Sequence, residues 1–114
     1  MVERWEPVAT AGDLAEGELK AVETPSGARV CLVNQRGVIY AVANNCTHQD
    51  FPMSEGVLLP REGRCVIECA WHGAQFDCAS GAVLKHPAED PIATFDVKTE
   101  NGRVVGARRA AVAP

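Results

Sequence analysis

Two short segments of the chain each place a cysteine and a histidine almost side by side. In "NNCTHQDFP" one residue separates Cys46 from His48, and in "IECAWHGAQFD" two residues separate Cys69 from His72. Thiolate sulfur and imidazole nitrogen are both ligands for zinc and for iron. Because each segment reads as a loop and supplies one ligand of each kind, we expect the two loops to build one shared metal site.

Two kinds of metal centre accept two cysteines and two histidines. A structural zinc site usually takes like ligands from each half, although tetrahedral zinc also accepts a mixed set. A two-iron, two-sulfide cluster of the Rieske type binds two cysteines on one iron and two histidines on the other. Each loop would then give its cysteine to one iron and its histidine to the second, so the mixed spacing has a geometric reason. The sequence favours the cluster and leaves zinc as an alternative.

The two loops lie between short apolar or alternating runs, each ended by a turn signal. Such runs predict β-strands over 18–24, 28–33, 38–43, 64–70, 74–77, 92–99 and 103–107. Hairpin turns are expected at "NQRG" and at the pair Asn101-Gly102. One helical turn is expected in 11–18, where Asp13 can cap the start and Gly17 stops it. The many short strands predict an all-β fold, an antiparallel β-sandwich or small barrel.

The stretch between the two loops decides whether they meet. If "GVLL" (56–59) pairs with "CVIE" (65–68), with "PREGR" (60–64) as the turn, both loops come to lie side by side. That pairing is therefore expected from the metal site as well as from the apolar pattern.

Length, composition and charge limit what the chain can do. With 114 residues, 46% of them hydrophobic, we expect one globular domain over 1–114. A net charge of −4 argues against a nucleic-acid partner and for a basic protein surface. The charged start "MVERWEPVAT" does not resemble a signal peptide, and no apolar stretch reaches the roughly 20 residues of a membrane helix. We expect a cytoplasmic protein whose five cysteines are metal ligands and buried thiols rather than disulfides.

The motifs "CTH" and "CAWHG" resemble those of the Rieske iron–sulfur family. The resemblance extends over "DLAEGELKAV", "SEG", "HGAQFDCASGAV" and "HPAEDPIATFDVK", and is to the small Rieske-type ferredoxins of aromatic-ring-hydroxylating dioxygenases. It implies an all-β Rieske fold with a cluster-binding subdomain over about 45–90. It also implies that Cys46 and Cys69 bind the inner iron of a [2Fe-2S] cluster, and His48 and His72 the outer iron. The gap between the two loops is longer than in that family, and the extra residues are expected near "LLPREGR".

The same resemblance implies a role and partners. The protein would be a monomeric electron carrier in aromatic hydrocarbon catabolism, and not itself an enzyme. It would take one electron from an NAD(P)H-dependent flavin reductase and pass it to a terminal Rieske oxygenase. Only His86 remains once the cluster has its two histidines, so a mononuclear iron site with two histidines and a carboxylate is not available. The alternatives are the small subunit of an assimilatory nitrite reductase and a zinc-stabilised interaction module.

The remaining cysteines and two other side chains near the loops have simpler interpretations. Cys31, Cys65 and Cys78 stand in apolar runs and are expected to be buried, unreactive thiols. By the resemblance, a proline-bearing segment near His86 covers the cluster, so His86 could approach it, but a surface histidine is the favoured interpretation. Trp71, which precedes a ligand, is expected either to pack in the core or to contact a partner.

The residues around the second loop predict the reduction potential. By the resemblance, high-potential Rieske proteins carry hydroxyl groups where this chain has Ala74 and Phe76, so two hydrogen bonds to the cluster are missing. We therefore expect a potential of roughly −150 mV, the lower end of the Rieske range. Phe51, Pro52 and Pro87 are expected to shield the cluster from water.

Overall fold

The computed structural model describes Val8 and residues 14–45, 52–61, 64–70, 73–86, 90–100 and 103–109. Almost all of the regular structure in these residues is β-strand. The strands are β1 (Leu19–Glu23), β2 (Arg29–Gln35), β3 (Val38–Ala43), β4 (Val57–Arg61), β5 (Arg64–Glu68), β6 (Gln75–Asp77), β7 (Val83–Lys85), β8 (Thr94–Glu100) and β9 (Arg103–Arg109). A single turn of 3-10 helix, η1 (Met53–Glu55), precedes β4.

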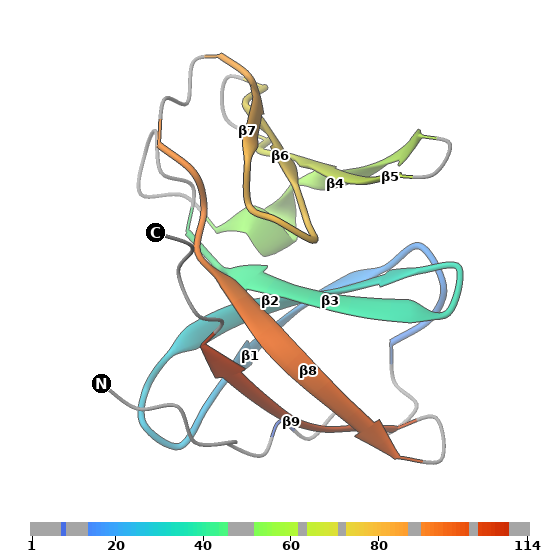
Figure 1. Ribbon diagram of the computed structural model, residues 1–114, viewed down its shortest axis with the longest axis vertical. Coiled ribbons are helices and arrows are strands. Elements are labelled where there is room, and N and C mark those ends of the chain that lie inside the picture. Colours follow the sequence, from blue (N-terminus) through green and yellow to red (C-terminus); the bar gives the residue numbers. More distant parts are fainter. Residues whose placement is uncertain are drawn as a thin grey trace.

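The strands form two antiparallel sheets. One has five strands in the order β1-β2-β3-β8-β9, and the other has four in the order β4-β5-β6-β7 (Figure 1). The small sheet lies against one side of the large one, near β2 and β3 (Figure 1). The predicted all-β antiparallel architecture is confirmed. Within the described residues, no helix is long and apolar enough to cross a membrane.

Strand β2 is covered on both faces, which explains its unbroken apolar sequence. Successive side chains of a strand point to opposite faces. Cys31 and Val33 belong to the hydrophobic cluster that also contains the buried residues of the small sheet. Val30 and Leu32 belong to a second cluster, on the other side of the strand, and all four side chains are fully buried. The apolar layer containing Cys31 is thus the one that supports the small sheet.

Three local features differ from the sequence-based expectations. The helical turn expected in 11–18 is a non-helical turn at Glu16–Gly17 in its described part, with Asp13 outside the described residues. This turn is held by the hydrogen bond from the Gly17 amide to the Asn34 carbonyl, 2.7 Å long. The turn expected over 60–64 is shorter, because β4 extends to Arg61 and β5 begins at Arg64. Proline is tolerated at position 60 because β4 is an edge strand. Helix η1 was not predicted.

Two expected pairings are confirmed. The turn at "NQRG" joins β2 to β3, with Gln35 opposite Val38. The strands β4 and β5 pair with Val57 opposite Glu68, as the metal site requires. β8 and β9 also pair, with Glu100 opposite Arg103 and a register shift between Lys98 and Thr99, while Asn101 and Gly102 of the expected hairpin lie outside the described part.

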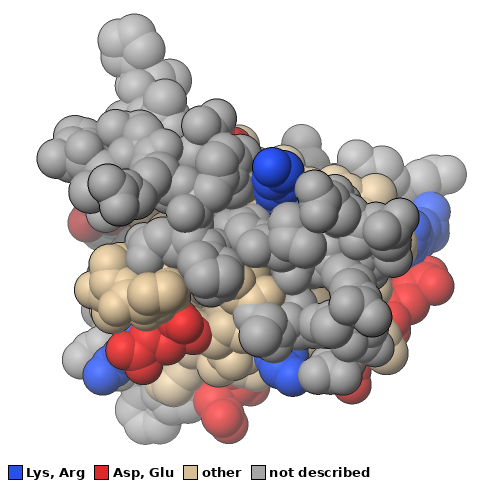
Figure 2. Space-filling view, turned by 90° about the horizontal axis from the view of Figure 1, so that it is seen from below, with Lys and Arg blue, Asp and Glu red and all other residues tan. Residues whose placement is uncertain are grey.

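The face seen from below in Figure 1 carries charges of both signs. Among the described residues of this face, acidic and basic side chains alternate over the surface and form no large patch of one sign (Figure 2).

Candidate metal centre

The second loop closes on itself directly after β5. The last residue pair between β5 and β6 joins Glu68 to Gln75, and beyond it the Cys69 amide donates a hydrogen bond of 2.8 Å to the Ala74 carbonyl. Gly73 has a φ of +76°, a conformation that side-chain-bearing residues adopt at a cost. His72 and Trp71 lie outside the described residues. The two described ends of the segment 69–74 are thus held together by backbone pairing.

The first loop is fixed at its base by a side chain. The Asn44 Oδ1 accepts a hydrogen bond of 2.7 Å from the Ser54 amide, ten residues further along the chain. Ser54 lies in η1, and the helix is closed by a 2.9 Å hydrogen bond from the Gly56 amide to the Met53 carbonyl. Cys46 and His48 lie outside the described residues. The residues just before and just after this loop are nevertheless held together.

A close backbone contact brings the two loops to the same end of the small sheet. Gly56 immediately precedes β4, and a Cβ atom there would collide with the carbonyl oxygen of Glu68. Its φ of −85° is ordinary, so glycine is required by space and not by backbone conformation. Glu68 is the residue before Cys69. The end of the first loop therefore lies against the start of the second, as the shared-site prediction requires.

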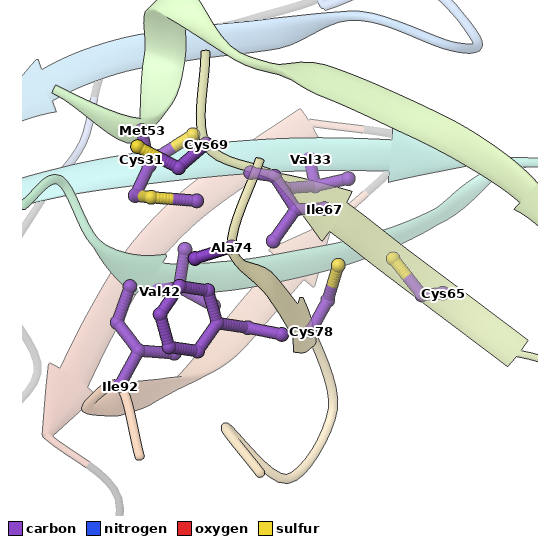
Figure 3. Packing of buried hydrophobic residues seen from close by; sticks show 11 residues of the cluster. Cys31, Val33, Val42, Met53, Cys65, Ile67, Cys69, Ala74, Cys78 and Ile92 are labelled. Carbon is purple, nitrogen blue, oxygen red and sulfur yellow. The ribbon is translucent and has the colours of Figure 1, made fainter. Parts of the chain in front are cut away.

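Cys69 is the one predicted ligand in the described residues, and it lies in the core. Its side chain is 1% exposed and belongs to the same hydrophobic cluster as Met53, Ala74 and Phe76. Figure 3 shows the sulfur atoms of Cys69, Cys31 and Met53 gathered at one end of this cluster. A thiolate ligand here would be held in apolar surroundings closed to water. This position fits the deeply placed, cysteine-bound side of an iron–sulfur cluster.

Cys31, Cys65 and Cys78 are buried, as predicted, and among the described residues no group of three or more histidine, cysteine, aspartate or glutamate side chains could hold a metal ion. The four described cysteines form no disulfide. Burial raises the pKa of Cys31 from 9.0 to about 12. The hydrogen bond with the Cys65 thiol, followed by burial, raises the pKa of Cys78 strongly. Neutral thiols in these sites are poor nucleophiles and poor ligands.

The residues that were expected near the cluster are only partly described. His86 is exposed, which confirms the interpretation as a surface histidine. Pro52 is also exposed, and Phe51 and Pro87 lie outside the described residues, so their shielding role stays a prediction. Ala74 and Phe76 are both fully buried. Asn44 and Gly56, which position the loops, were missed by sequence reasoning.

Comparisons with known proteins agree on one kind of domain. Residues 4–96 match the family model described as the Rieske [2Fe-2S] domain. The ferredoxin component of the naphthalene 1,2-dioxygenase/salicylate 5-hydroxylase systems of a Ralstonia species is 38% identical, over 92% of this chain and 96% of that protein. A chain in the complex of reduced oxygenase and oxidized ferredoxin in carbazole 1,9a-dioxygenase superposes with a TM-score of 0.82 at 28% identity, covering 97% of this chain and 100% of its own. The putative NADH-dependent nitrite reductase small subunit from Mycobacterium tuberculosis gives a TM-score of 0.77 at 26% identity, covering 97% and 100%.

Proposed function

Because the chain belongs to the Rieske [2Fe-2S] family and carries that family's cluster, we propose that it is the ferredoxin of an oxygenase system. It would take one electron from an NAD(P)H-dependent flavin reductase and deliver it to the Rieske centre of a terminal oxygenase. The observation that carries this proposal is the 38% identity to a ferredoxin component over 96% of that component's length. The family match also decides against the zinc-stabilised module that the spacing alone left open.

The proposed ligands are Cys46 and Cys69 on the inner iron and His48 and His72 on the outer iron. Support comes from Cys69, whose side chain is buried, as that of an inner ligand would be. The backbone contact between Gly56 and Glu68 supports the convergence of both loops on one cluster. The ligands would belong to a subdomain over about 45–90 within a single domain over 1–114.

When bound, the cluster accepts and releases one electron at a time. The chain's own part is to exclude water from the cysteine side, where Met53, Ala74 and Phe76 are fully buried, and to present the histidine side at the tip of the two loops. No general acid, base or nucleophile is required for this role, so the protein would be a carrier and not an enzyme. We further propose that it acts as a monomer in the cytoplasm, without nucleic acid or membrane partners.

A second candidate is the small subunit of an assimilatory nitrite reductase. It is favoured by the structural similarity to the putative nitrite reductase small subunit, with a TM-score of 0.77. The identity to that protein is 26%, against 38% to the dioxygenase ferredoxin component. The oxygenase role is therefore the primary proposal.

Anaerobic stopped-flow mixing tests the role directly. The oxidised protein is first mixed with NADH and the flavin reductase of a naphthalene dioxygenase system, and the bleaching of its visible absorbance is followed. The reduced protein is then mixed with the oxidised terminal oxygenase or with a sirohaem nitrite reductase. Fast re-oxidation by the oxygenase is expected. Failure of the reductase to reduce it, or re-oxidation by the nitrite reductase alone, would overturn the oxygenase assignment.

The ligand assignment has its own test. Replacing His48 or His72 with alanine removes one proposed nitrogen ligand of the outer iron, and each variant is expected to lose the Rieske electron paramagnetic resonance (EPR) spectrum. His86→Ala is the matched control, because His86 is exposed and is not a proposed ligand. An unchanged spectrum in either ligand variant would show that the assignment is wrong.

A further inference from the structure

The last residue of β5 holds a carboxylate against the second metal-binding loop. Glu68 precedes Cys69, and its Oε2 would lie 3.8 Å from a Cβ atom built on Gly73, the neighbour of His72 in the chain. The carboxylate therefore lies against the segment that contains the second pair of proposed ligands. It is half-buried, so water screens it less than it screens a fully exposed charge.

A buried amide fixes the position of this carboxylate. Gln75 lies opposite Glu68 in the β5–β6 pairing, and its Nε2 donates a hydrogen bond of 3.0 Å to Glu68 Oε2. Gln75 is 8% exposed, one of two buried polar side chains in the described part of the chain. Burying an amide is costly unless it is hydrogen-bonded. The pairing with Glu68 offsets that cost and restricts the carboxylate to one place beside the loop.

Among the described residues, the basic group in the cross-strand row of Glu68 compensates its charge only weakly. Val57, Glu68, Gln75 and Lys85 lie opposite one another across β4, β5, β6 and β7. Lys85 is the basic residue of this row. Its side chain is exposed, so water solvates the ammonium group, and Gln75 separates it from Glu68 in the row. Within the described part of this row, the Glu68 charge is thus largely uncompensated, and it lies beside the segment that would hold a centre that becomes more negative when it is reduced.

We propose that Glu68, positioned by Gln75, is a determinant of the reduction potential, holding it below the value that the cluster ligands alone would give. The inference rests on the proposed ligand set, because it places the charge beside the loop that carries Cys69 and His72. Two negative charges that approach one another disfavour the reduced state by Coulomb repulsion. The effect acts through space and requires no contact between the carboxylate and a ligand.

The test is the potential of Glu68→Gln measured by protein-film voltammetry at fixed pH. The substitution removes the charge and keeps the shape and a hydrogen-bond acceptor for Gln75. We expect the equilibrium constant for reduction to rise about fivefold, which at about 59 mV per tenfold is an upward shift of about 40 mV. Glu16→Gln is the matched control, because it removes the same charge from an exposed turn beside the Asn34 end of β2. It is expected to change the constant by less than about twofold.

EPR of each variant separates failure of this inference from failure of the proposed function. A Rieske spectrum with an unchanged potential in Glu68→Gln, or a shift equal to that of Glu16→Gln, would overturn the role of Glu68 and leave the electron-carrier proposal intact. Should Glu68→Gln not retain its cluster, Gln75→Met decides, because it keeps the carboxylate and removes the amide that holds it. In Gln75→Met, a rise in the equilibrium constant for reduction that is smaller than fivefold but larger than in Glu16→Gln supports the proposal. An unchanged potential in Gln75→Met overturns it.

Discussion

Replacing Gly56 with alanine tests how the two loops are brought together. The added methyl group would collide with the Glu68 carbonyl oxygen and lie 3.1 Å from the Met53 carbonyl oxygen. Both neighbours are backbone atoms, so no side-chain rotation can make room. Either β4 must separate from β5 at the pair Val57–Glu68, or η1 must move away. The first movement displaces Glu68, the residue before Cys69, and the second displaces η1, which follows the first loop.

The expected cost follows from this geometry. Overfilling a packed site costs about 1–3 kcal/mol, and a rigid backbone neighbour places Gly56→Ala in the upper half of that range. With a guanidinium slope of roughly 4 kcal/mol per molar, the denaturation midpoint should fall by about 0.5–0.75 M. Because either movement shifts the backbone at one end of a proposed metal-binding loop, cluster content should fall as well. Iron and sulfide per chain, and loss of visible absorbance with guanidinium, are the two measurements.

Gly37→Ala is the matched control for this prediction. Gly37 has a φ of +87° and nothing within 4 Å of an added Cβ, so the same substitution introduces backbone strain without a collision. The cost should be about 1–2 kcal/mol with full cluster content, since Gly37 lies in the β2–β3 turn. If Gly56→Ala kept its cluster and its midpoint, or if both variants lost cluster equally, the proposed role of Gly56 would be refuted.

Three further predictions concern the potential, docking and alkaline stability. The reduction potential of the wild type should lie near −150 mV. Ala74→Ser or Phe76→Tyr should raise the potential by less than about 60–130 mV for each hydrogen bond formed to the cluster. A wild-type potential well above 0 mV in voltammetry would contradict this prediction. Reduction by the reductase should slow as ionic strength rises, because a net charge of −4 favours a basic partner surface; a rate that increases steadily with salt in stopped flow would indicate apolar docking. Burial raises the pKa of Cys31 from 9.0 to about 12, so the folded state keeps a proton that the unfolded chain releases. This contribution to stability is complete below about pH 9 and is lost as the pH rises toward 12. The guanidinium denaturation midpoint should therefore fall more steeply with pH over that range in the wild type than in Cys31→Ala. Equal pH dependence in the two proteins would contradict the raised pKa of Cys31.

The strands and the paired loops were predictable because their signals are local. Alternating and apolar runs predicted β1, β2 and β3, and the pairing of β4 with β5 followed from the need to bring two Cys/His loops together. The motif spacing identified the family, which the match over residues 4–96 confirms. The ligand residues themselves stay a prediction, since only Cys69 of the four lies in the described residues.

The contacts that fix the loops could not be predicted in the same way. The hydrogen bond from Ser54 to Asn44 spans ten residues, and an asparagine before a loop has many possible partners. Gly56 has an ordinary φ, so neither turn chemistry nor backbone strain distinguishes it in the sequence. The need for glycine at position 56 becomes visible only in the folded structure, where the Glu68 carbonyl oxygen leaves no room for a Cβ atom. The expected turn over 60–64 was too long because a proline usually interrupts a strand, and the edge position of β4 removes that objection.

The central claim is that two histidines and two cysteines of this chain hold one [2Fe-2S] cluster. Electron–nuclear double resonance on the dithionite-reduced protein, prepared with isotopically labelled histidine, measures the nitrogen ligands directly. We predict couplings from two histidine nitrogens, one lost in His48→Ala and the other in His72→Ala wherever those variants retain a cluster, with His86→Ala unchanged. A reduced cluster without histidine couplings, or stoichiometric zinc with no labile sulfide in protein purified so as to preserve clusters, would contradict the account.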